Sequence, residues 1–183
     1  MAKKKAEEPT EIIQGIFSNE KVIAGSSDLA RELYEKSRMG EPFQKEKFQY
    51  ALVEALYLIE RGKMEVIAGR TVLDLDKFLK KARKLEPNFW TRYSVYKDMR
   101  NRGYIVKTAL KFGADFRVYD RGIKPGEDHA KWIIYPVHET EVETWYNFSA
   151  KNRVAHSTRK KLLVGCVDEE GDCTYWEIKW VKP

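Results

Sequence analysis

The chain has 183 residues, of which 43% are hydrophobic and 34% charged, a balance that excludes a disordered protein and suits two small domains. No apolar run approaches the roughly 20 residues that span a bilayer, and the basic start lacks the apolar stretch of a secretory signal. We therefore expect a cytoplasmic protein with a disordered tail at residues 1–9. The formal net charge of +6 favours a polyanionic partner, nucleic acid first.

The first half of the chain alternates strand-like with helix-like patterns. In chain order we expect a hairpin turn at Ser18–Glu20, a helix with Ser27 as its N-cap, an amphipathic helix over 47–62, a strand over 63–69, and a helix over 73–85 that buries Leu75, Phe78, Leu79 and Ala82. Nothing in this half gathers groups that do chemistry. We predict an N-terminal structural domain of mixed helix and sheet over residues 10–87.

The pattern changes after Pro87. We expect a helix with Phe89, Tyr93 and Tyr96 inward and Gly103 as its left-handed cap, strands over 104–110, 114–120 and 131–137, a helix from about Glu141 to Ser157, and strands over 161–168 and 174–181. This order predicts a catalytic α/β domain over residues 88–183, with a central mixed sheet flanked by helices. The fold class is α+β overall.

A tyrosine and a histidine face a short loop in this second half. Strand alternation sends Arg117 and Tyr119 to the polar face of their strand, with Tyr119 at its end. The loop that follows returns the chain at His129, and loops at strand ends often carry functional side chains. Taken singly, a strand-end tyrosine and a loop histidine are also ordinary surface residues.

The stretch "RVAHSTRKKLLVG" concentrates positive charge where a helix gives way to a buried strand. Arg159, Lys160 and Lys161 follow the expected helix end, where cations meet unpaired backbone carbonyls. Such cations also decorate many helix ends without function. We expect at least one of these side chains to lie beside the loop that carries His129.

A tyrosine, a histidine and a lysine together can cleave RNA through its own 2′-hydroxyl. One group removes the 2′-OH proton, a second protonates the 5′ leaving oxygen, and a cation stabilises the phosphorane. Histidine suits the acid, whereas a tyrosine is a poor base unless cations lie close to it. Arg117 and the lysines are candidates for those cations.

Two long stretches resemble one enzyme family. "GYIVKTALKFGADFRVY", a histidine ten residues after its tyrosine, and "RVAHSTRKKLL" are similar to the archaeal tRNA-intron endonucleases of the tRNA-splicing endonuclease family. The helical stretch "VEALYLIERG" is similar to the N-terminal domain of that family, so the resemblance covers nearly the whole chain.

The resemblance implies a role for each member of the triad. Tyr119 matches the general base, His129 the general acid, and Lys160 the cation that stabilises the transition state. The implied substrate is the bulge–helix–bulge of precursor tRNA, and the implied products are a 2′,3′-cyclic phosphate and a 5′-OH. Neither a metal nor another cofactor is implied.

The resemblance also implies binding and assembly residues. Arg153 matches an arginine that stacks on a bulge base, with Trp176 or Tyr175 as its partner from another subunit, and Arg117 is a further candidate for substrate binding. An acidic turn matches a loop that inserts into a neighbouring subunit; its acids are Asp168, Glu169, Glu170 and Asp172. One triad in a chain without an internal repeat implies a homotetramer, with a heterotetramer as the alternative.

Two other interpretations remain open from the sequence. Glu177 and Lys179 form the E-x-K pattern of magnesium nucleases, with Asp168 and Asp172 upstream. A structural, non-catalytic RNA-binding subunit is the second alternative. The two cysteines and three histidines lack metal-ligand spacing, so we expect no metal site.

Overall fold

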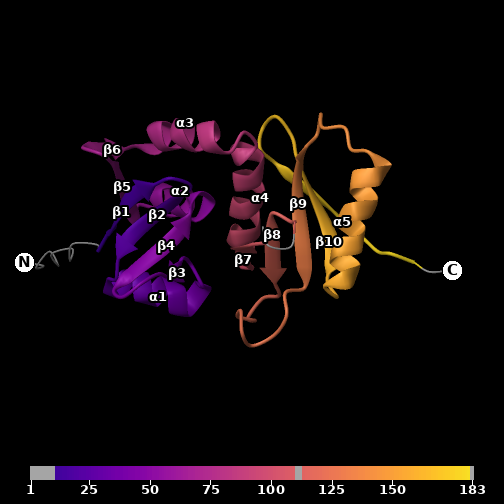
Figure 1. The fold of residues 1–183 in the computed structure, drawn as a ribbon, viewed down its shortest axis with the longest axis horizontal. Coiled ribbons are helices and arrows are strands. Elements are labelled where there is room, and N and C mark those ends of the chain that lie inside the picture. Colours follow the sequence, from indigo (N-terminus) through magenta and orange to yellow (C-terminus); the bar gives the residue numbers. More distant parts are fainter. Residues whose placement is uncertain (1–10, 110–112, 182–183) are drawn as a thin grey trace, which may run out of the picture. The chain divides into compact units, whose positions relative to one another are not determined.

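The computed structural model describes residues 11–109 and 113–181 and divides the chain into two compact units between Ala82 and Arg83. Figure 1 shows the elements of both units in chain order. The tail expected at residues 1–9 lies outside the described residues. Across the two described ranges, none of the helices has the length and apolar character that crossing a bilayer requires. The expected α+β fold is confirmed.

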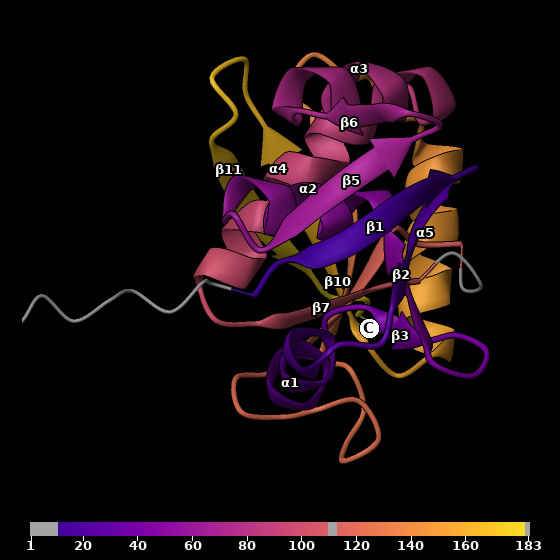
Figure 2. The same ribbon diagram turned by 90° about the vertical axis from the view of Figure 1, so that its left-hand side faces the viewer.

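The first unit is a mixed sheet with helices around it. Its elements are β1 (Ile13–Ser18), β2 (Lys21–Gly25), α1 (Asp28–Ser37), β3 (Glu41–Pro42), β4 (Lys47–Ala51), α2 (Leu52–Glu60), β5 (Met64–Ala68), β6 (Thr71–Leu73) and α3 (Leu75–Leu85). Within the described residues the strand order is β3-β4-β2-β1-β5-β6, and only the β1–β5 pair is parallel. Figure 2 shows β1, β5 and β6 side by side at one end of this sheet.

Several expected features of this unit are confirmed. The β1–β2 hairpin pairs Ser18 with Lys21, which leaves two residues in its turn. The side chain of Ser27 caps α1 by accepting a hydrogen bond from the amide of Ala30 at 3.2 Å. The strand expected over 63–69 is β5.

The single helix expected over 47–62 is wrong in its first third. Residues Lys47–Ala51 form β4, which pairs with β2 on one side and β3 on the other, and the helix begins only at Leu52. Phe48 and Tyr50 are buried on one face of β4. Phe48 stands two residues before Tyr50, which fits a strand, and four residues before Leu52, which fits a helix. The pattern alone therefore does not reveal the boundary.

The helix expected over 73–85 begins two residues later, and one of its expected core residues is exposed. Phe78 and Ala82 are fully buried, whereas Leu75, at the first position of α3, is 41% exposed. Leu73 belongs instead to the short strand β6. A leucine in a first helical turn has no preceding turn to fold back on and is easily left at the surface.

The second unit is a five-stranded mixed sheet, as far as the structure describes it, with a helix on each face. Its elements are α4 (Phe89–Asn101), β7 (Ile105–Thr108), β8 (Phe116–Tyr119), β9 (Trp132–His138), α5 (Trp145–Ser157), β10 (Lys161–Val167) and β11 (Cys173–Ile178). The strand order is β11-β10-β9-β8-β7, and only β9 and β10 are parallel. The helix expected from about Glu141 begins four residues later, after Thr144 caps it.

The two helices of this unit cover opposite faces of the sheet (Figure 1). On the face of α4, the ring of Tyr96 meets that of Phe116 at 5.8 Å, and a β-carbon at Gly165 would lie 3.0 Å from Val95. On the face of α5, Ala155 packs with Ile133, Leu162 and neighbouring apolar residues. The alternate residues Arg117 and Tyr119 of β8 therefore face the α5 side, away from α4.

A buried carboxylate closes the start of α2. The two carboxylate oxygens of Glu54 accept hydrogen bonds from the amides of Ala51 at 2.9 Å and Gly40 at 3.3 Å. We predict that Glu54→Ala lowers the free energy of unfolding by about 1–3 kcal/mol, because these buried amides lose their acceptor. Chemical denaturation measures this change. Glu35→Ala, which removes an exposed glutamate from α1, should change stability by less than about 0.5 kcal/mol; equal effects would contradict the prediction.

Candidate active site

The site lies at the edge of the second sheet where three strand ends meet. Because β8 runs antiparallel to β9, the end of β8 lies beside the start of β9, with Val118 opposite Trp132. Because β10 runs parallel to β9, its start lies there too, with Lys161 opposite Trp132. The amide of Lys161 donates to the carbonyl of Lys131 at 3.0 Å. Residues just outside these three ends are thus held together.

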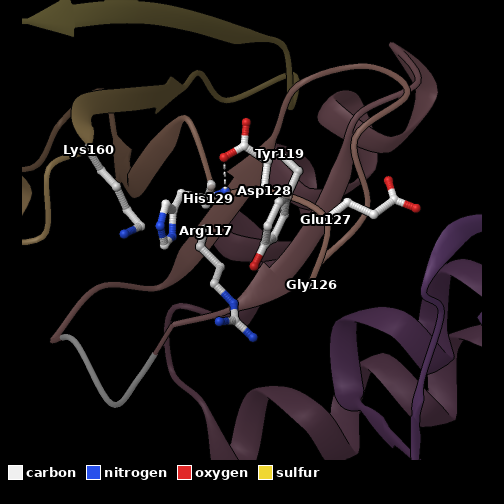
Figure 3. A pocket seen from close by; sticks show the side chains of 8 residues that line it. Arg117, Tyr119, Gly126, Glu127, Asp128, His129 and Lys160 are labelled. Atoms are coloured by element: carbon white, nitrogen blue, oxygen red, sulfur yellow. Dashed lines mark hydrogen bonds between the residues drawn. The ribbon is translucent and has the colours of Figure 1, made fainter.

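A pocket of about 410 Å³ opens at this edge. It is lined by Arg117, Tyr119, Gly126, Glu127, Asp128, His129, Ala130 and Lys160. In Figure 3 the ends of the Lys160 and His129 side chains point toward one another, while Glu127 points away from them. The structure thus brings together the three residues to which the sequence assigned the triad, and Arg117 with them.

Tyr119 is held rigidly at the end of β8. Its side chain is only 5% exposed and packs with Ile105 and Ala130. The Arg117 guanidinium lies 5.9 Å from the centre of the Tyr119 ring. The buried Nε of Arg117 has no hydrogen-bond partner in the part of the chain that the structure describes. The pocket therefore has a cation in its wall beside the tyrosine, an arrangement that suits an anionic ligand.

His129 is exposed at the end of the loop after β8. Two local features constrain this loop. Gly126 adopts a φ of +98°, and the amide of Lys124 donates a hydrogen bond to a carboxylate oxygen of Glu127 at 3.0 Å. The amide of His129 donates to the carboxylate of Asp128 at 2.6 Å, which sets the direction of the backbone where the imidazole leaves it. The ring itself stays open to the pocket.

Lys160 follows the end of α5. Arg159 takes a left-handed φ of +54°, which turns the chain out of the helix, and the Lys160 amide then donates to the carbonyl of Ala155 at 2.9 Å. The Lys160 ammonium donates to the carbonyl of Thr158 at 2.9 Å. The expected placement of one cation at the helix end, beside the loop that carries His129, is what the structure has. Lys161 instead pairs with Glu177 at 2.9 Å.

A second, smaller hollow of about 250 Å³ also has Lys160 in its wall. It is lined by Asn152, Ala155, His156, Lys160, Lys161, Leu162, Ile178, Lys179 and Trp180. The rings of His156 and Trp180 meet edge to face, with centroids 4.3 Å apart. The sequence pattern placed Trp180 only within the strand expected over 174–181, whereas β11 ends at Ile178. The position of Trp180 against α5 depends on the tertiary fold, and no local spacing reveals it.

The residues expected to bind the bulge lie outside the main pocket. Arg153 is exposed on α5, and Trp176 is 52% exposed on β11. Tyr175, the alternative to Trp176, makes an intramolecular contact instead: its hydroxyl donates a hydrogen bond to Asp98 at 2.8 Å. Burial raises the pKa of this hydroxyl. Of the two aromatic candidates, Trp176 is therefore the one available to a ligand or a second subunit.

The acidic turn lies at the far end of β10 from the pocket. One strand length of seven residues, about 23 Å, separates the turn from Lys160. A side-chain oxygen of Asp168 accepts from the amide of Asp172 at 2.8 Å, and Gly171 supplies a φ of +91°. Glu169, Glu170 and Asp172 are exposed. The turn is thus preformed, and its carboxylates face solvent.

The carboxylates of the alternative magnesium site do not meet. Glu177 accepts from the Trp132 indole at 2.9 Å and pairs with Lys161, near the start of β10. Asp168 and Asp172 lie at the opposite end of the hairpin, as the β10–β11 register requires. Across residues 11–109 and 113–181, no three His, Cys, Asp or Glu side chains gather where a metal ion would be held.

Comparison with known proteins matches two stretches of the chain, one in each of the two units. Residues 89–175 match the family described as tRNA intron endonuclease, catalytic C-terminal domain, and residues 13–79 match the N-terminal domain of the same family. The second unit is thus a catalytic domain of an RNA-processing endonuclease.

Curated relatives span both domains. The chain is 46% identical to a tRNA-splicing endonuclease of Nanoarchaeum equitans, over 72% of this chain and 88% of the relative. It is 37% identical to that of Methanothermobacter thermautotrophicus, over 93% and 99%, and 39% identical to that of Thermococcus kodakarensis, over 91% and 96%. The chain belongs to the tRNA intron endonuclease family. The expected resemblance and the expected enzyme class, a tRNA-splicing endonuclease with archaeal homologues, are confirmed.

The Asp128–His129 hydrogen bond gives a test of how the loop positions the pocket. We predict that Asp128→Ala slows RNA cleavage about three- to tenfold at saturating substrate, because the backbone at His129 loses about 1 kcal/mol of restraint. Asp128→Asn keeps an oxygen acceptor and should retain most of the rate. Single-turnover cleavage measures both variants; equal losses in both would show that the charge, and not the hydrogen bond, matters.

Proposed function

We propose that this protein excises introns from precursor tRNA in the cytoplasm by cutting bulge–helix–bulge junctions without a metal ion. The 2′-hydroxyl attacks the adjacent phosphorus and the bond to the 5′-oxygen breaks. Tyr119 takes the 2′-OH proton, His129 gives a proton to the leaving oxygen, and Lys160 faces the negative phosphorane. The products are a 2′,3′-cyclic phosphate and a 5′-OH. Residues 88–183 carry this chemistry, and residues 10–87 form the structural domain.

The observation that carries the proposal is the common pocket of the three side chains. A proton acceptor, a proton donor and a cation line one hollow of about 410 Å³, which has room for a phosphate group and its flanking atoms. Tyr119 is fixed by packing, whereas His129 is exposed to an entering ligand. Such a division suits a base that is positioned beforehand and an acid that must reach a leaving group.

Substrate binding is assigned to residues around this pocket. The guanidinium of Arg117, which lines the pocket, is assigned to a phosphate oxygen. Arg153 and Trp176 are exposed and are assigned to a bulge nucleotide, the guanidinium and the indole stacking on the base from different subunits. Unstacked bulge bases are accessible to such contacts, while duplex RNA is read mainly by shape.

The decisive experiment is cleavage of a bulge–helix–bulge RNA in the presence of EDTA. We expect two cuts, with cyclic phosphate and 5′-hydroxyl ends in the fragments, identified by mass spectrometry. Loss of cleavage in EDTA, with recovery on addition of magnesium, would contradict the proposal. It would instead support the alternative of a magnesium nuclease that uses Glu177.

His129 gives the sharpest single-residue test. We predict that His129→Ala slows cleavage by a factor of about 10² to 10⁴, the usual effect of losing a general acid, with RNA binding nearly unchanged. His138→Ala is the matched control, because His138 lies at the far end of β9. An RNA with a 5′-thiolate leaving group needs no protonation and should restore the rate of His129→Ala. Absence of such rescue would remove His129 from the acid role.

We propose a homotetramer in which the acidic turn binds a neighbouring subunit. The turn presents Asp168, Glu169, Glu170 and Asp172 in a chain whose net charge is +6, so electrostatic attraction favours its insertion into a basic surface of another copy. The native mass should be four times 21.5 kDa. Replacing Glu169, Glu170 and Asp172 by neutral amides should lower that mass in native mass spectrometry. A tetramer of unchanged mass would contradict the proposed role of the acidic turn in subunit contact.

A further inference from the structure

The outer face of α3 concentrates positive charge. Lys77, Lys80, Lys81 and Lys84 fall within an arc of about 100° at 3.6 residues per turn. Phe78 and Ala82, which are buried, lie on the other side of the helix. We call these four lysines the α3 basic face. It extends about 10 Å along the helix axis.

Helix stability accounts for only part of this face, because Lys84 alone of the four lies in the last turn, where a cation interacts favourably with the helix dipole. Its lysines stand three or four residues apart, a spacing at which like charges repel and destabilise a helix. A helix face that serves only solubility mixes acids with bases. Lys77 pairs with Asp74 at 2.7 Å, and Lys81 lies 5.1 Å from the centre of the Phe17 ring.

Two of the lysines lack any acidic partner. Within residues 11–109 and 113–181, neither Lys80 nor Lys84 forms an ion pair, and both are exposed. Their charges repel each other, and Asp76, which stands four residues before Lys80, forms no ion pair with it among the residues that the structure describes. An external anion that approaches this face would relieve it.

We propose that the α3 basic face binds the sugar–phosphate backbone of the substrate RNA. This inference rests on the proposed function, which supplies a polyanionic substrate. Lysine ammonium groups on flexible stems act as point charges and suit contacts with phosphates that carry no sequence information, whereas arginine suits paired, directional recognition. The face therefore contributes affinity for the helical parts of the RNA and leaves the choice of cleavage site to the pocket.

The test compares two triple variants with the same change in charge. One is Lys80→Gln, Lys81→Gln and Lys84→Gln; the control is Lys21→Gln, Lys45→Gln and Lys47→Gln, which removes exposed lysines elsewhere in the first unit. Binding is measured on a bulge–helix–bulge RNA with 2′-deoxy nucleotides at both cut sites, over a range of salt concentrations.

We expect the α3 variant to bind at least about tenfold more weakly at 0.1 M salt, with the slope of log K against log salt reduced by about 2 to 3. The control variant should keep the slope of the wild type. Cleavage of the natural RNA by the α3 variant should show a raised KM and an unchanged kcat.

Three results would overturn the inference. They are an unchanged slope in the α3 variant, an equal loss in the control variant, and a fall in native mass, which would assign the face to contact with another subunit. Failure of the wild-type protein to cleave the natural RNA would instead remove the proposed function itself.

Discussion

The parallel pairing of β9 with β10 is the constraint on which the site depends. β8, β9 and β10 are consecutive in the sheet, and their pairing directions bring the end of one and the starts of two to a single edge. Tyr119 ends β8, His129 precedes β9 by three residues, and Lys160 immediately precedes β10. A register shift of one residue between β9 and β10 would move Lys160 by about 3.3 Å and turn the strand's side chains to the other face.

The two helices of the second unit stabilise that edge of the sheet by packing on its two faces. α4 is packed on one face of the sheet through aromatic residues, and Gly165 allows its close approach. α5 lies on the other face and ends where Lys160 begins, so the same helix that covers the core also delivers the cation. The tight turn at Arg159 then returns the chain directly into β10. The helix that packs on the sheet thus also positions a residue of the candidate site.

The charges of the chain are distributed unequally over its surfaces. Cations line the pocket at one end of β10, while the acidic turn occupies the other end, about 23 Å away. The basic face of α3 adds a third charged surface, in the first unit. The proposed RNA substrate and the proposed assembly of identical chains both favour such separation, because a basic surface attracts RNA and repels a like-charged surface of another copy.

Much of the fold follows from local patterns. The hairpin at Ser18–Lys21, the N-cap at Ser27 and the left-handed turn at Gly103 are decided by a few neighbouring residues, and the structure has all three. The boundary at Ala51 between β4 and α2 does not follow, because Phe48 stands two residues before Tyr50, as in a strand, and four before Leu52, as in a helix. Only pairing with β2 and β3 decides between them.

For the candidate site, the sequence determined which reactive side chains are present and their local framework. It supplied a tyrosine at a strand end, a histidine on the next loop and lysines at a helix end, because each position depends on the residues around it. Only the tertiary structure decided that these side chains line one pocket, that Tyr175 is committed to Asp98, and that Trp180 lies against His156. These outcomes depend on strand order and register, which arise from contacts between residues far apart in the chain, and no local pattern encodes them.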